Sequence, residues 1–309
     1  MKRSLRLALG LTVALALLGA ACGGDDSDSE SSSTSAAAAK PKITIGAQDF
    51  GESLILAEIY KQGLVAKGFT ASIQKLGGYR DLEVVAFDDG TINLAPEYAA
   101  SMLEFLNDKK GEASGDVDAT VEKLQTYLDA KKLKALDVSD AIDTNAFVMT
   151  KAKANQLGIR SLSDLATKGG DLTLGGPADC ETNPFCTPGL KTTYGADLSG
   201  KFKALETGQV AAALDAGQID IAVLFSTDGR IKAKDYFLLA DDKHMLAADN
   251  VLPIVTNALA GNNSLTDATN AITAKLTTVA LIDMNKQYDV DKVDAAVIAK
   301  AFLDANALM

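Results

Sequence analysis

The sequence predicts an α/β protein with two similar lobes, and an internal repeat is the main observation behind this prediction. The segment DAGQIDIAVLFSTDGRI begins at Asp215, and the segment DDGTINLAPEY, which begins at Asp88, has the same pattern 127 residues earlier. In both copies a helix-like run ends in Asp-x-Gly, and a short apolar strand follows it directly. A chain that contains the same unit twice is expected to build two lobes of the same kind.

Each repeat unit also has one large aromatic residue at the equivalent position, where the apolar strand ends: Tyr98 in the first copy and Phe225 in the second. In open α/β sheets, the groups that face a ligand lie just past the carboxyl ends of the strands. Tyr98 and Phe225 are therefore the first candidates for opposite walls of one cleft. The alternative is that both are ordinary core aromatics at the ends of strands.

The order of the elements agrees with two βα series. Lys42–Ala47 is expected to be a buried strand and Glu52–Lys67 an amphipathic helix, with Asp49 and Glu52 resembling a capping box at its start. The strands are expected to be parallel and joined by helices through right-handed crossovers. The other expected elements are strands over 69–75, 133–138, 145–150, 171–176, 202–206 and 236–240, and helices over 80–87, 99–106, 116–132, 152–157, 162–166, from 189, 264–285 and 292–306.

This order also predicts how the chain is divided between the lobes. The stretch after residue 249 has no partner strands in the second series, so it is expected to pack back onto the first lobe. Lobe 1 would then comprise residues 41–140 and 250–309, and lobe 2 residues 141–249. The chain would cross between them near 137–144 and near 239–249, and two such crossings make a hinge.

The amino terminus is predicted to be an export signal over residues 1–21, because a basic start is followed by an apolar run that is short for a membrane span. The sequence LLGAAC resembles a bacterial lipoprotein signal, which implies lipidation of Cys22 and attachment to the extracytoplasmic face of the cell membrane. Cleavage without a lipid is the alternative. The rest of the segment over residues 22–40 is acidic and rich in serine, and it is expected to be a flexible tether.

Charge and cysteine content exclude several classes of function. Without residues 1–21 the chain has 27 basic residues (30 minus 3) against 41 acidic ones, a net charge of −14, which argues against a nucleic-acid partner. Cys180 and Cys186 are expected to form a disulfide in an oxidising compartment. The single histidine, His244, supports neither a metal site nor a catalytic triad, and the sequence contains no phosphate-binding glycine loop. No cofactor and no enzymatic activity are predicted.

Several segments together resemble the substrate-binding proteins of ABC importers for glycine betaine, choline and related osmoprotectants. They follow the order of that family from Ile43 to Val255: IGAQDFGESLILAEIYKQGL, the G-x-I-N-L-x-P-E-Y stretch that ends at Tyr98, LGGPADCETNPFCTPGLKTTYG, FSTDGRI and DDKHMLAADNVLPIV. The resemblance implies a two-lobe, type II periplasmic-binding-protein-like fold with two interlobe crossings and the ligand in the cleft. It also implies a monomeric receptor that delivers a quaternary ammonium compound to a membrane permease driven by an ATPase.

Members of this family hold a trimethylammonium group in a cage of tyrosines. By the resemblance, Tyr98 keeps its place in the cage and Phe225 stands where a tyrosine is usual, while Thr187 and Ser139 occupy two further cage positions. Gln48 stands where a lysine often contacts the ligand carboxylate. We expect Asp137 or Asp143 to add negative charge. The remaining candidate ligand contacts are Phe50, Asn145, Thr182, Phe185, Ser226 and Thr227.

Two alternatives remain open at this stage. The depleted cage is compatible with a receptor of the same shape for an amino acid or another small polar solute. An enzyme with two lobes, such as porphobilinogen deaminase, is the second alternative, because fold does not determine function. Asp228 also has two interpretations, as a ligand contact or as the cap of the turn that follows it.

Overall fold

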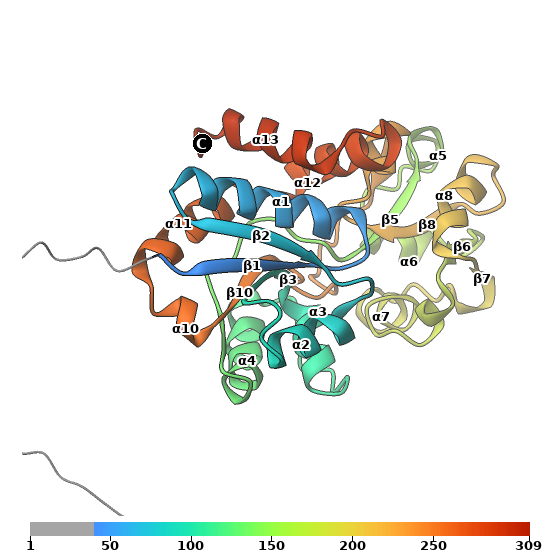
Figure 1. Ribbon diagram of the computed structural model, residues 1–309. Helices are drawn as coiled ribbons and strands as arrows, with labels where there is room; N and C mark the ends of the chain where they lie inside the picture. Colours follow the sequence, from blue (N-terminus) through green and yellow to red (C-terminus); the bar gives the residue numbers. More distant parts are fainter. Residues whose placement is uncertain (1–39) are drawn as a thin grey trace, which may run out of the picture. The chain divides into compact units, whose positions relative to one another are not determined.

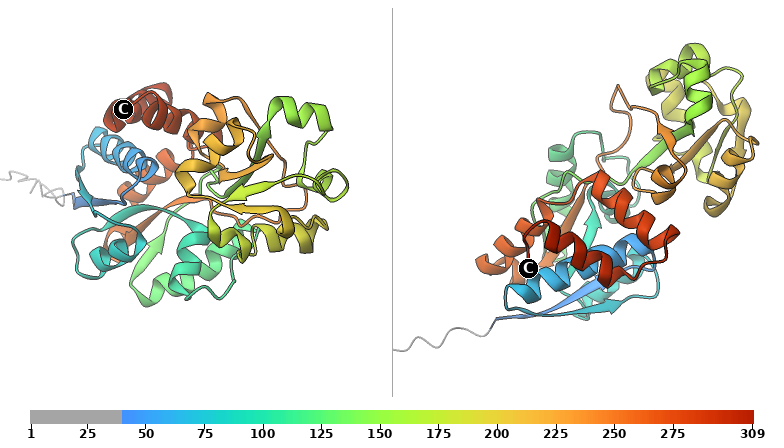
Figure 2. Two further views of the ribbon diagram at one scale, coloured as in Figure 1. Left: turned by 90° about the vertical axis from the view of Figure 1, so that its right-hand side faces the viewer. Right: turned by 90° about the horizontal axis from the view of Figure 1, so that it is seen from above.

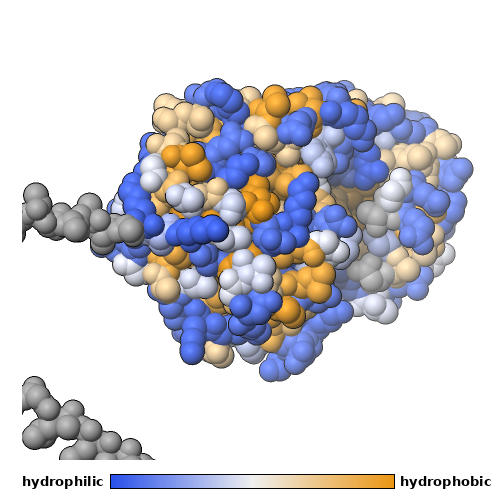
Figure 3. Space-filling view, in the orientation of Figure 1, coloured by the Kyte–Doolittle hydropathy of each residue, from blue (hydrophilic) through white to orange (hydrophobic). Residues whose placement is uncertain are grey.

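The computed structural model describes residues 40–309. The predicted export signal, the lipidation site Cys22 and nearly all of the predicted tether lie outside the described residues, so these features remain predictions. No helix within residues 40–309 is long and apolar enough to cross a membrane. On the face drawn in Figure 3, apolar side chains lie in patches separated by hydrophilic ones.

The described chain forms two five-stranded mixed sheets, each covered by helices (Figures 1 and 2). The first sheet has the order β2 (Thr70–Lys75), β1 (Lys42–Ala47), β3 (Leu94–Tyr98), β10 (Val251–Thr256), β4 (Leu133–Ala135). The second sheet has the order β7 (Phe202–Ala204), β6 (Leu174–Gly176), β8 (Ile221–Phe225), β5 (Asn145–Thr150), β9 (Tyr236–Leu238). The predicted α/β architecture with two lobes is confirmed.

The internal repeat predicted from the sequence is present in three dimensions. Helix α2 (Arg80–Asp88) leads into β3, and helix α8 (Thr207–Asp215) leads into β8, so both elements recur at the same offset. Gly90 and Gly217 lie in the two connecting turns with positive φ angles of 78° and 65°, a conformation that glycine adopts without steric cost. In each sheet the repeated strand lies between one parallel and one antiparallel neighbour.

The expected parallel arrangement holds for only part of each sheet: β1 is parallel to β2 and β3, and β6 is parallel to β7 and β8. Strand β10 runs antiparallel to β3, with Val251 opposite Tyr98, and β5 runs antiparallel to β8, with Asn145 opposite Phe225. The reason is the path of the chain. Strand β5 is the first strand in the sequence after the first crossing, and β10 is the first after the second crossing. They enter their sheets beside the carboxyl ends of β8 and β3, respectively. A strand that enters at that end has to run back along its neighbour.

The helices agree with the predicted order, with two changes. The expected helix over 264–285 is split into α11 and α12, and the helix expected from 189 begins at Thr187 and continues as a π-helix over Leu190–Tyr194. The remaining helices are α1 (Gly51–Ala66), α3 (Ala99–Leu106), α4 (Val117–Ala130), α5 (Lys151–Leu157), α6 (Leu165–Lys168), α7 (Thr187–Gly189), α9 (Gly229–Ala233), α10 (Asn257–Ala260), α11 (Asn263–Thr273), α12 (Thr278–Asn285) and α13 (Ala295–Ala305). Short 3-10 turns cover Leu162–Asp164, Ala178–Glu181 and Ser199–Lys201, and a second π-helix covers Lys286–Val290.

Helix α1 is central to the first lobe because it is buried on more than one side. Ile55, Leu56, Ile59 and Tyr60 are all fully buried. The sheet covers one side of α1, and α11 and α13 cover another, with α13 lying alongside α1 in Figure 1. A helix that is apolar around most of its circumference is typical of such an interior position. The start of this helix is therefore held rigidly relative to the first sheet.

Both predicted crossings are confirmed, and the two segments pair with each other. The backbone N–H of Asp143 donates to the carbonyl of Asp249 at 3.0 Å, and Val251 donates to Ala141 at 2.8 Å. An isolated antiparallel bridge joins Ile142 to Asn250 between them. The connection between the lobes is thus a pair of hydrogen-bonded strands rather than two independent linkers. The exact boundaries of the lobes, at 140–141 and 249–250, remain a prediction.

The segment after residue 249 packs onto the first lobe through β10 and α13, as expected, but it also contacts the second. Helix α12 and the π-helix after it pack against α9, where Lys232 forms an ion pair with Asp283. A Cβ atom added to Gly229, the first residue of α9, would lie 2.3 Å from the backbone nitrogen of Lys286. The α9 backbone therefore approaches the C-terminal segment as closely as a residue without a side chain allows.

We predict that Gly229→Ala destabilises the protein by about 1–3 kcal/mol, because the added methyl group overlaps backbone atoms that cannot rotate away. Thermal or urea unfolding would measure this change. Gly200→Ala is the matched control, because an added Cβ at this exposed position in the second lobe meets no atom within 4 Å. Equal stability of the two variants would contradict the proposed close packing.

Candidate functional site

A row of three aromatic rings begins with Tyr98 at the carboxyl end of β3 and continues through Phe50, before α1, to Tyr79, before α2. The ring of Tyr98 lies 6.3 Å from that of Phe50, and Phe50 stacks on Tyr79 with a centroid distance of 6.5 Å. Tyr98 is only 5% exposed, Phe50 is partly exposed and Tyr79 is largely exposed. The row therefore runs from the interior of the first lobe to its surface. Tyr79, which precedes α2, was not among the residues selected from the sequence.

Glu52 is buried next to Tyr98. The Tyr98 hydroxyl donates to Oε1 of Glu52 at 2.6 Å, and the side-chain amide of Asn285 donates to Oε2. The predicted capping box of Asp49 and Glu52 is wrong, because Phe50 occupies the cap position and no side chain caps the helix. Glu52 lies in the first turn of α1, but its carboxylate is directed to the residues at the end of β3 instead of the helix backbone.

Behind Tyr98, three charged side chains and one amide form a buried network. Gln48 donates through Nε2 to Glu83 at 3.0 Å and to Glu97 at 2.8 Å. Arg80 binds both carboxylate oxygens of Glu97, at 2.7 and 2.8 Å. Burial and the neighbouring charge of Glu97 raise the pKa of Glu83 well above its usual value. Gln48, a predicted ligand contact, thus uses its amide nitrogen within the first lobe.

The second lobe contributes three predicted residues to the same region. The Thr227 hydroxyl donates to Oδ1 of Asp143 at 2.8 Å, and the Ser226 hydroxyl donates to the carbonyl of Ile142 at 2.8 Å. The backbone carbonyl of Thr227 accepts a hydrogen bond of 2.9 Å from Asn285. Because the same amide of Asn285 also donates to Glu52, this side chain links the two lobes.

Burial and neighbouring charges raise the pKa values of the acidic groups in this region. Burial raises the pKa of Asp143 well above its usual value, and the charge of Glu52 raises it further. Burial likewise raises the pKa of Glu52. The pKa of Tyr98 is raised first by burial and then by the charges of Glu52 and Asp143. Tyr98 therefore remains a neutral phenol near the carboxyl groups of Glu52, on α1, and Asp143, in the first crossing.

Phe225 ends β8 and differs from Tyr98 in its exposure. Its side chain is 49% exposed, whereas Tyr98 is almost fully buried. The interpretation of both residues as core aromatics therefore does not hold for Phe225. The repeat therefore has rings at two equivalent strand ends: Tyr98 is buried in the first lobe, and Phe225 is exposed to solvent.

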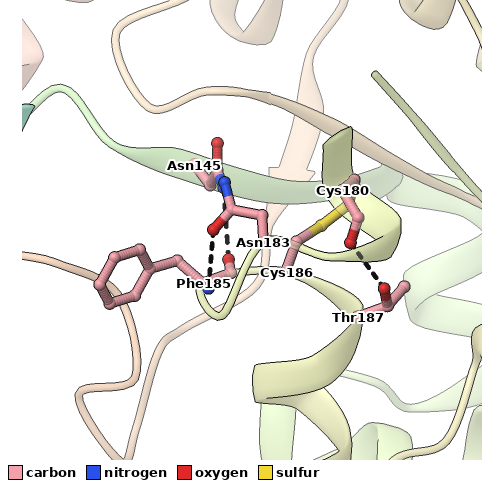
Figure 4. Close-up of a disulfide and its surroundings, with 6 residues drawn as sticks. All are labelled: Asn145, Cys180, Asn183, Phe185, Cys186 and Thr187. Carbon is pink, nitrogen blue, oxygen red and sulfur yellow. Dashed lines mark hydrogen bonds between the residues drawn. A yellow bond between two sulfur atoms is a disulfide. The ribbon is translucent and has the colours of Figure 1, made fainter. Parts of the chain in front are cut away.

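The cysteine loop holds Thr182 and Phe185, with Thr187 directly after it and Asn145 of β5 beside it, and Figure 4 shows its surroundings. Cys180 and Cys186 form the predicted disulfide, and the Thr187 hydroxyl donates to the carbonyl of Cys180 at 2.6 Å. Asn145 donates to the carbonyl of Phe185 at 3.3 Å, and the ring of Phe185 points away from the disulfide (Figure 4). Phe185 packs against the hydrophobic cluster of the first lobe. Thr182 is exposed on this loop.

Three further residues discussed from the sequence lie apart from this cluster. Asp137 is exposed in the first crossing, where its backbone N–H donates to Asn270 of α11. Ser139 is buried, and its hydroxyl donates to the carbonyl of Val251 between the two crossings. Asp228 caps α9 by accepting from the backbone of Arg230 at 2.8 Å, so the cap interpretation is confirmed.

Sequence reasoning missed Tyr79, Arg80, Glu97 and Asn285. For Glu97 a signal was available, because it is a charged residue inside the otherwise apolar strand Leu94–Tyr98, and all five residues of that strand are buried. Asn285 had no such signal, since it contacts residues that are 58 and 233 positions away in the chain.

Two cavities among residues 40–309 lie away from this cluster. A cavity of about 550 Å³ lies between the ends of α2 and α4 and the start of β4, and it is lined by residues such as Phe87, Lys132 and Asn257. The second lies on the outer side of α13, near Gln62 and Lys300. Neither contains the aromatic and carboxylate groups described above, so the candidate site rests on those groups and not on cavity size.

Comparison with known proteins identifies the family. Residues 41–305 match the family described as the substrate-binding domain of the ABC-type glycine betaine transport system. The chain belongs to this family. It is thus a binding protein of importers for glycine betaine-, carnitine- and choline-type compounds and not an enzyme, which confirms the resemblance found in the sequence.

Individual relatives are distant but cover most of the chain. A glycine-betaine-binding protein of Pseudomonas aeruginosa is 24% identical over 280 residues, which are 86% of this chain and 88% of the relative. A carnitine transport binding protein of Listeria monocytogenes is 24% identical over 53% of this chain and 54% of the relative. A crystal structure of a glycine betaine/carnitine/choline ABC transporter superposes with a TM-score of 0.79 at 25% identity, covering 87% of this chain and 99% of that one.

Asp249 provides a pH test of the buried acidic cluster in this family member. It lies in the second crossing, accepts hydrogen bonds from the backbone and hydroxyl of Ser101, and is 8% exposed. Burial raises its pKa from 3.8 to about 6. The folded protein therefore binds more protons than the unfolded chain between about pH 4 and pH 6, so this group lowers the stability as the pH rises through that window.

We predict that Asp249→Asn removes this dependence. Between pH 4 and pH 7 the wild type should lose up to about 3 kcal/mol of unfolding free energy relative to the variant. Urea unfolding of both proteins at several pH values would measure the difference. A difference in stability that does not change with pH would show that Asp249 titrates at its ordinary pKa.

Proposed function

We propose that this protein binds a quaternary ammonium solute between its two lobes and presents it to a membrane permease driven by an ATPase. The observation that carries the proposal is the network from Tyr98 through Glu52 and Asn285 to Thr227 and Asp143. It joins both lobes through groups that suit a cation. The paired crossings would serve as the hinge about which the lobes close on the solute.

The binding energy would come mainly from aromatic rings and carboxylates. A cation over an aromatic face contributes roughly 0.5–2 kcal/mol per ring, depending on how far the pair is removed from water. Phe50, Tyr98 and Phe225 are the proposed rings, and Asp143 and Glu52 supply negative charge. Asn145, Thr182, Phe185, Thr187, Ser226 and Thr227 remain proposed contacts or supports, although the hydroxyls of Thr187, Ser226 and Thr227 already have partners within the protein.

We also propose that the protein is a monomeric lipoprotein on the extracytoplasmic face of the cell membrane, attached through Cys22. The amino-terminal sequence supports this, because a signal-like stretch is followed by LLGAAC and an acidic tether. The tether would let the folded body, which begins near residue 41, stand off the membrane surface and reach the permease. Release of the Cys22→Ser variant from the membrane fraction of the producing cell would test the anchor.

Isothermal titration calorimetry against a panel of solutes tests the main proposal. The panel contains glycine betaine, choline, carnitine, proline betaine and ectoine, together with common amino acids. We expect at least one trimethylammonium compound to bind and the amino acids to give no heat. Binding of an amino acid alone would favour the alternative, a receptor of the same fold for another small polar solute.

We predict that Phe225→Ala weakens binding of the trimethylammonium ligand about 2- to 30-fold, which corresponds to the loss of one ring. The melting temperature should change little, because Phe225 is half exposed and contributes little to the core. Leu238→Ala is the matched control, since Leu238 belongs to the same sheet and is 41% exposed. Similar affinities of the two variants would remove Phe225 from the site.

A further inference from the structure

The site described above contains spare hydrogen-bond acceptors, whereas its donors are already in use. The Tyr98 hydroxyl donates to Glu52, and the Thr227 hydroxyl donates to Asp143. The Asn285 amide nitrogen donates to Glu52 and to the Thr227 carbonyl, and the amide nitrogen of Gln48 donates to two glutamates. In contrast, the Oδ1 atom of Asn285 has no hydrogen-bond partner, although the residue is only 5% exposed.

The charges at the site are also unbalanced. Arg80 is the basic residue of the buried network, and Glu97 binds its guanidinium through both carboxylate oxygens. Glu52 and Asp143 have no ion-pair partner within residues 40–309, and the groups that stabilise their charged forms are hydroxyl, amide and backbone donors. The region around Tyr98 therefore holds more carboxyl groups than cations.

The amino end of α1 is the other feature that could receive an anionic group, because the first N–H groups of a helix are free. In this protein Glu52 lies in that first turn, and its carboxylate is an acidic group close to the helix end, although it binds Tyr98 and Asn285 and not the helix backbone. At the amino end of α9, the Asp228 carboxylate accepts from the Arg230 backbone and also pairs with the Arg230 guanidinium. A ligand carboxylate at either helix end would therefore lie near an acidic side chain.

We propose that this site selects solutes by charge, and that it prefers a monovalent quaternary ammonium alcohol such as choline to a zwitterion such as glycine betaine. Both ligands present the same trimethylammonium group to the rings. The alcohol adds a hydroxyl donor, which Asn285 Oδ1 can accept. The zwitterion adds a carboxylate, which faces Glu52 and Asp143 and finds no free cation. This inference rests on the proposed function and names the class of solute within it.

Calorimetry on the full chain tests the preference with three probes of similar size. They are choline, glycine betaine and 3,3-dimethylbutan-1-ol, which is an uncharged isostere of choline. We expect choline to bind at least tenfold more tightly than glycine betaine, and the uncharged alcohol to bind more weakly than choline. Glycine betaine that binds as tightly as choline would overturn the inference and leave the proposed function intact. If neither choline nor glycine betaine binds, this inference is overturned, and the proposed function is wrong as well if no quaternary ammonium compound of the larger panel binds.

Substitution of the two carboxylates assigns the cause. Glu52→Gln and Asp143→Asn should each reduce the ratio of choline affinity to glycine betaine affinity at least threefold, by weakening choline binding, strengthening glycine betaine binding, or both. Glu58→Gln is the matched control, because Glu58 lies on the same helix and pairs with Lys61 away from the site. A ratio that stays at the wild-type value in both site variants would show that other groups set the preference. The wild-type ratio remains decisive even if one buried variant fails to fold.

Discussion

The folded state depends on keeping several carboxyl groups buried near the junction of the lobes. Removing an ionised carboxylate from water costs several kcal/mol unless hydrogen bonds or a counter-charge offset the loss. Glu97 is held by Arg80 and Gln48, Glu52 by Tyr98 and Asn285, and Asp249 by Ser101. These donors come from strand ends, helix ends and the C-terminal segment. The requirement to satisfy the acids therefore fixes the relative positions of elements that are distant in the sequence.

On the proposed function, the same requirement sets the stability of the free protein against solute binding at this place. The pKa values of Glu52 and Asp143 are raised because burial disfavours their charged forms, and the charge of Glu52 raises the pKa of Asp143 further. A core of apolar side chains would avoid this cost. A bound cation would offset it, so that binding and closure would relieve a repulsion present in the free protein. The strain is concentrated where the two crossings meet, which is also where the lobes would move.

The two-sheet architecture is shared between this chain and its relatives, and part of it is repeated within the chain. Relatives at 24–25% identity cover most of the chain, so the arrangement of two sheets and two crossings persists when most side chains have changed. Within the chain, α2 and β3 recur as α8 and β8 at a constant offset, with Tyr98 and Phe225 at equivalent strand ends. The two copies have diverged in environment, since one ring is buried and the other half exposed. The repeat therefore determines where the two rings stand in the fold, and the residues around each ring determine how far it is exposed.

The sequence alone determined the two α/β units, because glycines with positive φ at Gly90 and Gly217 and the strands after them are encoded by local pattern. It also determined the short disulfide loop and the family. Only the tertiary structure decided that β5 and β10 run antiparallel, since strand direction follows from the path of the crossings. It likewise decided that Glu52 binds Tyr98 instead of capping its helix, and that Asn285 joins the lobes. Those contacts link residues 46 and 233 positions apart, a separation that no local pattern records.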